Sequence, residues 1–278
     1  MNPPACLSHH TEKNQRYAVS VHPIVLPDAD AVGEEVAATI LDRLAATGDR
    51  RFLLGCPSGR TAMPTYRALA RHAARGADLS RLIIVMMDDY VVAGEDGTFR
   101  RVDPDLSYSC LGFARRQILG PIAQACAEAG TVAPTEIWMP DPADPASYDQ
   151  AIDVAGGIDL FLLATGAGDG HIAFNQPGTA RNARTHVTPL GEATRRDNMG
   201  TFPEFTRLDM VPTHGVTVGV DTIAACSREV VMIVCGEHKR DAYARITAAE
   251  AYEPDWPATV VIECKNPTLI ADRAAAGR

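Results

Sequence analysis

Short, continuous apolar runs that alternate with helix-forming segments constrain the fold of this chain more than any other feature. Such runs are typical of strands buried on both faces, as in a parallel sheet covered by helices. They lie at residues 52–56, 82–87, 158–164, 230–235 and 258–262. Between them, apolar residues recur at helical spacing over 28–46, 61–75, 110–129 and 145–154. This alternation predicts an α/β fold, a parallel sheet with helices on both faces.

Four polar segments directly follow apolar runs, at the points where the predicted strands end. They read PSGRT (57–61), DDY (88–90), TGAGDGH (165–171) and GEHK (236–239). The carboxyl ends of parallel strands meet at one edge of the sheet, where α/β proteins bind their ligands. We therefore expect the four segments to form one active site, although each alone could be an ordinary turn. The segment 91–109 is rich in Gly, Asp and Pro and is expected to be a long loop.

Composition and charge exclude several classes of protein. With 278 residues, 46% of them apolar and 22% charged, the chain can bury a full core and is not globally disordered. A formal net charge of -9 argues against nucleic acid or an anionic membrane surface as the partner, but not against a small anionic substrate. No apolar run approaches the roughly 18 residues of a membrane span, and no secretory signal begins the sequence. We expect a flexible segment at 1–16 and one α/β catalytic domain at 17–278.

The seven cysteines form no C-x-x-C pair and have no metal-ligand spacing. This pattern indicates reduced thiols in a cytoplasmic protein without a metal site. Cys56, which precedes the first polar segment, is either a core residue or a neighbour of the site. The histidines other than His171 also lack metal-like spacing, and we assign them no role.

The segment 58–61 is a tight turn between a strand and a helix. Free backbone N–H groups at the start of a helix, together with the helix dipole, favour an anion such as phosphate. The turn contains Ser58, Gly59, Arg60 and Thr61. Lys239, before another predicted helix, can add a second cation. A plain turn and an exposed lysine are the alternatives.

Two other segments carry acid–base side chains. Asp88 and Asp89 are adjacent, so they point in different directions and only one need face the site. A carboxylate at this position can be a general base, a metal ligand or a helix cap. In the glycine-rich loop 165–171, Asp169 lies two residues before His171. A carboxylate so close can orient an imidazole that transfers protons near neutral pH.

Four segments, in the same order along the chain, closely resemble glucosamine-6-phosphate deaminases, also called isomerases. They are residues 55–69, 86–91, 156–179 and 211–239, and the motif DGHIAFN within 156–179 is the most specific. The resemblance spans residues 17–275 and implies a Rossmann-like α/β fold. 6-Phosphogluconolactonases share the D-G-H core and diverge directly after it.

The resemblance implies acid–base chemistry on a hexosamine 6-phosphate, without a metal or organic cofactor. His171, aided by Asp169 and residue 176, opens the pyranose ring. Asp88 then moves a proton from C2 to C1, and water displaces ammonia to give a ketose phosphate. The 58–61 turn and Lys239 hold the phosphate. The partner is thus a small sugar phosphate; a homo-oligomer is compatible with the sequence, which leaves the oligomeric state open.

Three positions depart from the family pattern. Gln176 replaces the glutamate that helps the histidine to open the ring, and a neutral amide cannot stabilise imidazolium by charge. Gly200 stands where the family has a phosphate-contacting arginine, and Arg60 lies within an altered phosphate turn. Arg60 therefore either supplies the missing guanidinium, or belongs to an anion site retuned for another acidic or non-phosphorylated sugar. The 91–106 loop also differs from the family pattern, which leaves the substrate open.

Two further classes of function stay open. A lactonase-like hydrolase would use His171 to activate water for attack on a sugar lactone. A non-catalytic sugar-phosphate sensor could use the same fold, although no helix-turn-helix or basic region is attached. The deaminase is favoured because the acid–base residues and the lysine are all retained.

Overall fold

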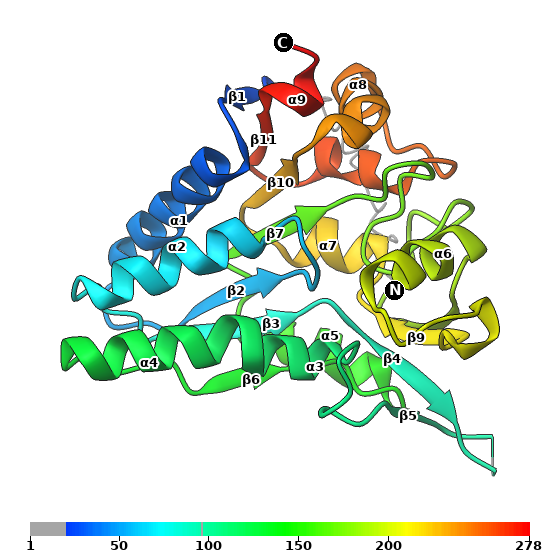
Figure 1. Cartoon of the computed structure of the whole chain (residues 1–278), viewed down its shortest axis with the longest axis horizontal. Helices are drawn as coiled ribbons and strands as arrows, with labels where there is room; N and C mark the ends of the chain where they lie inside the picture. The colour runs from blue at the N-terminus through cyan, green and yellow to red at the C-terminus, as the bar shows by residue number, and fades with distance from the viewer. Residues whose placement is uncertain (1–20, 96) are drawn as a thin grey trace, which may run out of the picture.

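The computed structural model describes residues 21–95 and 97–278. Its centre is a seven-stranded sheet in which all neighbouring strands are parallel (Figure 1). The strands lie in the order β1 (Ile24–Leu26), β11 (Pro267–Asp272), β10 (Val230–Val234), β7 (Leu160–Ala164), β2 (Phe52–Cys56), β3 (Leu82–Met86) and β6 (Glu136–Trp138). The predicted parallel sheet is confirmed, whereas the prediction for residues 1–16 lies outside the described residues.

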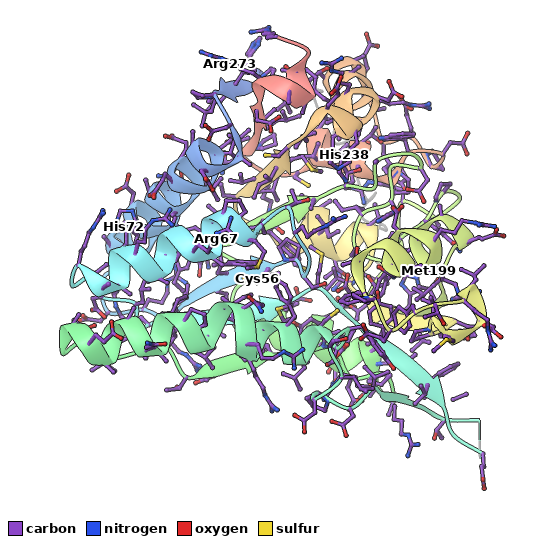
Figure 2. The ribbon with its side chains drawn as sticks, viewed as in Figure 1. Cys56, Arg67, His72, Met199, His238 and Arg273 are labelled. Carbon is purple, nitrogen blue, oxygen red and sulfur yellow. The ribbon has the colours of Figure 1, made fainter. Side chains whose placement is uncertain are left out.

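Four of the five apolar runs form the central strands β2, β3, β7 and β10. Successive side chains alternate between two cores, one on each face of the sheet: Leu54 belongs to the first and Leu53 to the second. Both faces are therefore buried, which explains why the runs are continuously apolar. Cys56, labelled in Figure 2, ends β2 and is fully buried. Because it packs in the first core, Cys56 is a core residue, and this burial raises the pKa of its thiol to about 12.

The prediction of a strand at 258–262 is wrong. These residues lie in a 3-10 helix (Pro257–Glu263), and the strand that completes the sheet follows at Pro267–Asp272. A short apolar run cannot by itself distinguish a buried helix from a buried strand. Pro257 lies in the first turn, where a proline favours a helix start, and the run packs in the second core.

Helices cover both faces of the sheet, as predicted. On one face, α2 (Met63–Ala74) packs between α1 (Ala29–Ala46) and α4 (Gly120–Ala129) (Figure 1). The predicted helix at 110–129 is α3 (Cys110–Phe113), a π-helical turn (Ala114–Leu119) and α4 in succession. The other face carries α5 (Pro145–Val154), α7 (Val220–Cys226) and α8 (Arg240–Ala248). Among the helices of residues 21–95 and 97–278, none is both long and apolar enough to cross a membrane.

A second sheet, of four antiparallel strands, was not expected from the sequence. Its order is β5 (Phe99–Arg101), β4 (Asp88–Ala93), β9 (His214–Thr217) and β8 (His186–Pro189). The prediction of a long loop at 91–109 is therefore wrong for 91–101, where β4 and β5 form a hairpin, whereas residues 102–109 form no helix or strand. The pairing that holds β4 joins Asp88 to Thr217, more than a hundred residues away, and no local pattern reports it. In Figure 1 this sheet and α6 (Glu192–Thr201) lie on the side to which β2, β7 and β10 point.

Candidate active site

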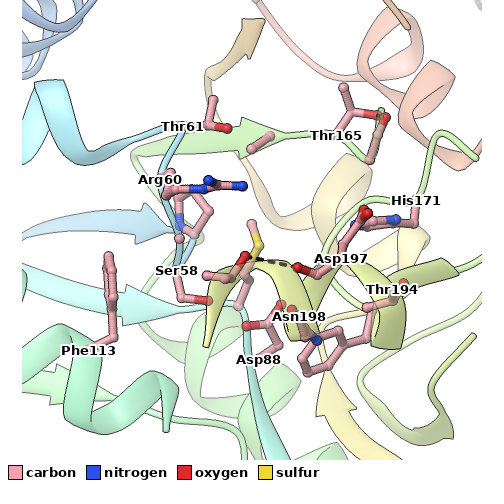
Figure 3. Close-up of a pocket in the computed structure, with 18 of the residues that line it drawn as sticks. Ser58, Arg60, Thr61, Asp88, Phe113, Thr165, His171, Thr194, Asp197 and Asn198 are labelled. Atoms are coloured by element: carbon pink, nitrogen blue, oxygen red, sulfur yellow. Dashed lines mark hydrogen bonds between the residues drawn. The ribbon is translucent and has the colours of Figure 1, made fainter. Parts of the chain in front are cut away.

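A cavity of about 660 Å³ lies at the carboxyl ends of the parallel strands. All four polar segments predicted to converge contribute to its wall. The β4 strand, α6 and a set of aromatic side chains complete it. Figure 3 shows labelled side chains from several of these elements directed into one space. The parallel sheet produces this convergence because its strands all end on the same side.

The turn 58–61 forms one wall of the cavity, and Ser58, Gly59, Arg60 and Thr61 all line it. Gly59 has a φ of +95°, which a side chain would strain, so glycine lets the backbone turn here. Arg60 extends from this turn into the cavity (Figure 3). Its side chain is exposed and makes no hydrogen bond or ion pair with the described residues. The guanidinium is thus available to a ligand.

Lys239 brings a second cation to the same cavity. It ends a 3-10 turn (Glu237–Lys239) directly before α8, and its ammonium donates a hydrogen bond to the carbonyl of Thr165. Burial lowers the pKa of Lys239, whereas the charges of Asp197 and Asp169 oppose that shift. Arg60 is close enough to lower the pKa of Lys239 further. The two cations therefore act on one region of the cavity, as the sequence predicts for an anion site.

Asp88 and Asp89 point in different directions and have different tasks. Asp88 is 4% exposed and lines the cavity, whereas Asp89 is fully buried and does not. The Asp89 carboxylate accepts hydrogen bonds from the backbone N–H groups of Cys110 (2.8 Å), Leu111 (3.3 Å) and Tyr90 (2.9 Å). Asp89 thus has one of the roles considered from the sequence, because it accepts hydrogen bonds from the backbone at the start of α3. Asp88 faces the cavity and is available to a ligand.

The environment of Asp88 makes it suitable as a base. Burial raises the pKa of its carboxyl to about 7, and a hydrogen bond from Cys110 opposes that shift. The Cys110 sulfur lies 3.4 Å from Asp88 Oδ1. A carboxylate with a near-neutral pKa can accept a carbon-bound proton and still release it, as general base catalysis requires.

The glycine-rich loop holds His171 against Asp169. The Nδ1 atom of His171 lies 2.7 Å from Asp169 Oδ1. His171 lines the cavity while Asp169 lies behind it, which leaves Nε2 as the ring nitrogen available to a ligand. Burial raises the pKa of Asp169, but its hydrogen bond to His171 and the histidine's charge outweigh burial and hold the pKa below its ordinary value. A Cβ at Gly166 would lie 2.3 Å from both Asp169 Oδ1 and His171 Nδ1, so glycine is required there.

Comparison with known proteins places this site in a family. The family model of glucosamine-6-phosphate isomerases/6-phosphogluconolactonase matches residues 27–270. The chain belongs to this isomerase/lactonase family. The glucosamine-6-phosphate deaminase of Exiguobacterium sp. is 34% identical over 248 residues, which cover 88% of this chain and 87% of that protein. The deaminase of Streptomyces avermitilis is 33% identical over 258 residues, or 92% of this chain and 91% of that protein.

Solved structures of the isomerase/lactonase family share the fold. A monomeric glucosamine-6-phosphate deaminase superposes with a TM-score of 0.77 at 26% identity, covering 93% of this chain and 99% of that one. The 6-phosphogluconolactonase of Trypanosoma cruzi superposes with a TM-score of 0.66 at 17% identity, covering 95% and 98%. The second likeness shows the shared architecture alone.

Two positions that depart from the family pattern lie away from the cavity wall. Gln176, predicted as a catalytic residue, is half-buried but does not line the cavity, and its side chain lies beside Gly191. Within the described residues it makes no hydrogen bond to His171, whose Nδ1 is held by Asp169. Gly200 is exposed and also outside the cavity wall. The other predicted site residues line the cavity or, in the case of Asp169, contact a residue that does, whereas Gln176 and Gly200 do neither.

Helix α6 contributes a wall that the sequence analysis did not assign. Thr194, Asp197 and Asn198 line the cavity from this helix (Figure 3). His238, to which the sequence analysis gave no role, lines it as well. Spacing could have found the helix residues: positions 194, 197, 198 and 201 recur at helical intervals and share one face. Aromatic rings form another wall, where Tyr90 and Tyr108 pack edge to face.

Proposed function

We propose that this protein converts glucosamine 6-phosphate and water into fructose 6-phosphate and ammonia. The observation that carries the proposal is one cavity that joins a buried carboxylate, an oriented imidazole and two cations. The carboxylate is Asp88, the imidazole is His171, and the cations are Arg60 and Lys239. Relatives 32% and 34% identical over most of their lengths carry the name glucosamine-6-phosphate deaminase, which supports this choice of substrate.

The phosphate of the substrate binds between the 58–61 turn and Lys239. Arg60 and Lys239 supply charge, Thr61 supplies a hydroxyl donor, and Ser58 lines the same turn. Charge-assisted hydrogen bonds to a phosphate are stronger than neutral ones, so these contacts anchor the substrate. This anchoring sets the sugar across the cavity toward Asp88 and His171.

His171 opens the ring. Its Nε2 takes the proton from the O1 hydroxyl, the C1–O5 bond breaks, and the proton passes to O5. The imidazolium that forms in between is stabilised by the negative charge of Asp169, 2.7 Å from Nδ1. Asp169 also sets the tautomer, because Nδ1 must carry hydrogen to donate to it. The ring-opening step therefore does not depend on a charge at Gln176.

Asp88 carries out the isomerisation. In the open chain it takes the proton from C2, while O1 takes up the proton that the ammonium group of the substrate releases, which gives an enolamine. Asp88 then returns its proton to C1, which leaves an iminium at C2. Water adds to C2 and ammonia leaves, so the ketose phosphate forms. Each step moves a proton or adds water, and the chemistry requires no metal or organic cofactor.

The direct test is incubation of the purified protein with glucosamine 6-phosphate, with ammonia and fructose 6-phosphate measured separately. Equal amounts of the two products are expected. Binding of the sugar phosphate without release of ammonia would overturn the deaminase and leave a sensor. The competing lactonase is tested with 6-phosphogluconolactone in the same preparation, because the family includes both activities.

One pair of variants separates the two reactions. Both reactions need His171, whereas only deamination needs a base at C2. His171→Ala is therefore expected to remove either activity, and Asp88→Asn to remove deamination alone. Lactone hydrolysis that survives in Asp88→Asn, without any deamination by the wild type, would favour the hydrolase.

The setting of the reaction is part of this proposal. We place it in the cytoplasm, in agreement with the six described cysteines, all of which are free thiols. The solved relative described as monomeric supports a site that needs no partner subunit. The partner is a small sugar phosphate and not nucleic acid, in line with the net charge of -9.

A further inference from the structure

We propose that Cys110 is a positioning residue for Asp88: its thiol orients the carboxylate that serves as base, and the Ser58 hydroxyl orients the thiol. The inference deepens the proposed function and rests on it, because Asp88 is the base only in that reaction. It concerns a buried cysteine for which neither the composition nor the motifs indicate a role.

Three groups form a continuous chain from the phosphate turn to the base. The Cys110 sulfur lies 3.3 Å from Ser58 Oγ and 3.4 Å from Asp88 Oδ1. An ionised carboxylate only accepts hydrogen bonds, and a thiol has a single hydrogen. The thiol therefore donates to Asp88, and the Ser58 hydroxyl donates to the sulfur. The direction of the chain is fixed by this count of hydrogens.

The backbone holds Cys110 in place for this contact. Cys110 is 2% exposed and is the first residue of α3. Its N–H donates to Asp89 Oδ1 at 2.8 Å, and the preceding Ser109 caps the helix by accepting from Gly112 N at 3.1 Å. The neighbouring carboxylate thus fixes the helix start from which the thiol reaches Asp88.

Among the described residues, Cys110 is the only hydrogen-bond donor to the Asp88 carboxylate. The titratable groups around that carboxylate are Asp89, Cys110 and the phenols of Tyr66, Tyr90 and Tyr148. Tyr66 donates to the carbonyl of Pro57 and Tyr148 to that of Met86, both at 2.7 Å. These two hydroxyls are therefore engaged elsewhere, and Asp89 adds only like charge.

The choice of a thiol has a chemical consequence. A thiol is a weak donor, whereas a hydroxyl at the same place would stabilise the ionised carboxylate more strongly. A weak donor fixes the orientation of Asp88 and removes little of its basicity. The base thus keeps a pKa of about 7, close to the value that suits proton transfer at neutral pH.

The test compares Cys110→Ala and Cys110→Ser with the wild type in the pH dependence of kcat/KM for deamination. The acidic limb should move upward in Cys110→Ala by about half to one pH unit, because a donor that favours the ionised form is lost. In Cys110→Ser it should move below the wild-type position, because a stronger donor is gained. Cys110→Ala should also lose about tenfold in kcat through disorder of the base, and the serine should restore most of that loss.

The matched control is Cys126→Ala. Cys126 is a fully buried cysteine on α4, continuous with α3, and it lies outside the cavity wall. The acidic limb of the pH profile of Cys126→Ala should coincide with that of the wild type. The positioning role would be overturned if the acidic limb of Cys110→Ala coincided with that of the wild type. It would also be overturned if Cys126→Ala shifted the limb as much as Cys110→Ala does.

A second measurement separates this inference from the proposed function. The Asp88 carboxyl is titrated by carbon NMR in the unliganded full-length protein, with its signal assigned through Asp88→Asn. The same order of midpoints is expected: serine variant lowest, then wild type, then alanine variant. Ordered midpoints without ammonia release would keep the positioning role and reject the deaminase. Deamination together with midpoints that do not follow this order would support the deaminase and reject the positioning role. Should the alanine variant fail to fold, the serine variant alone still gives the predicted downward shift or contradicts it.

Discussion

The side chains of His171 and Asp169 form a pair in which Nδ1 lies 2.7 Å from Oδ1, with the histidine on the cavity wall and the aspartate behind it. In the proposed mechanism Asp169 therefore acts through His171, because it is not among the residues that line the cavity. Asp169→Asn should lower kcat for deamination by about 10²- to 10⁴-fold, because the imidazolium loses its counter-charge and the ring its preferred tautomer. The KM should change little. Steady-state kinetics check both, and a kcat within about threefold of the wild type would contradict this role.

The acidic limb of the pH profile should report Asp88. Asp88 must be ionised to accept the C2 proton, and burial raises its pKa to about 7. The kcat/KM for deamination should therefore be constant above this pH and fall about tenfold per unit below it. A limb near pH 4, the ordinary range of an aspartate, would contradict the raised pKa of Asp88.

Asp88 should also limit the stability of the fold. A carboxyl whose folded pKa lies above its unfolded value favours folding while it is neutral, and this contribution is lost as the pH rises from about 4 through about 7. Asp88→Asn removes the buried charge, so at pH 8 it should stabilise the protein by about 1–3 kcal/mol while abolishing deamination. Urea unfolding at pH 8 and pH 4 checks this, and a gain of equal size at both values would contradict it.

Arg60 should govern affinity for the phosphate. Arg60→Ala removes a charged donor that faces the cavity, worth about 1.5–3 kcal/mol, so the KM for glucosamine 6-phosphate should rise about tenfold to a hundredfold. The control is Arg67→Ala on α2, an exposed arginine outside the cavity wall that faces Asp30 at 3.7 Å (Figure 2). An unchanged KM in Arg60→Ala would remove Arg60 from the anion site.

The negative charge of Asp197 should weaken binding of the phosphate group of the substrate. This charge lines the same cavity and is felt by Lys239. Asp197→Asn should lower the KM for glucosamine 6-phosphate by about twofold to fivefold, with a larger effect at low ionic strength. A higher KM would indicate that Asp197 binds the amine or a hydroxyl of the substrate. Titration of KM against salt distinguishes a charge effect from a lost contact.

Gln176→Glu tests whether the residue matters at all to ring opening. The side chain lies beside Gly191 and outside the cavity wall, so restoring the family's glutamate should leave kcat within about threefold. A large gain would show that residue 176 reaches His171 during the reaction. The measurement is kcat at saturating substrate beside the wild type.

The candidate site was predictable from the sequence to the extent that it depends on strand ends. PSGRT, TGAGDGH and GEHK follow buried strands, and parallel pairing brings strand ends together whatever their order in the sheet. The wall made by α6 was missed because it follows no strand of the parallel sheet. The run 258–262 was misassigned because hydrophobicity reports burial and not the type of element.

The sequence by itself determined the parallel sheet, the helices on its two faces and the edge at which the polar segments meet, because periodicity and strand ends are local properties. Only the tertiary structure decided that Asp88 faces the cavity while Asp89 caps a helix. Pairing of β4 with β9 sets that orientation, through contacts between residues more than a hundred positions apart. The tertiary structure also places the Cys110 thiol between Ser58 and Asp88, and it keeps Gln176 out of the cavity wall. Such contacts depend on which distant segments pack together, and a local pattern contains no record of them.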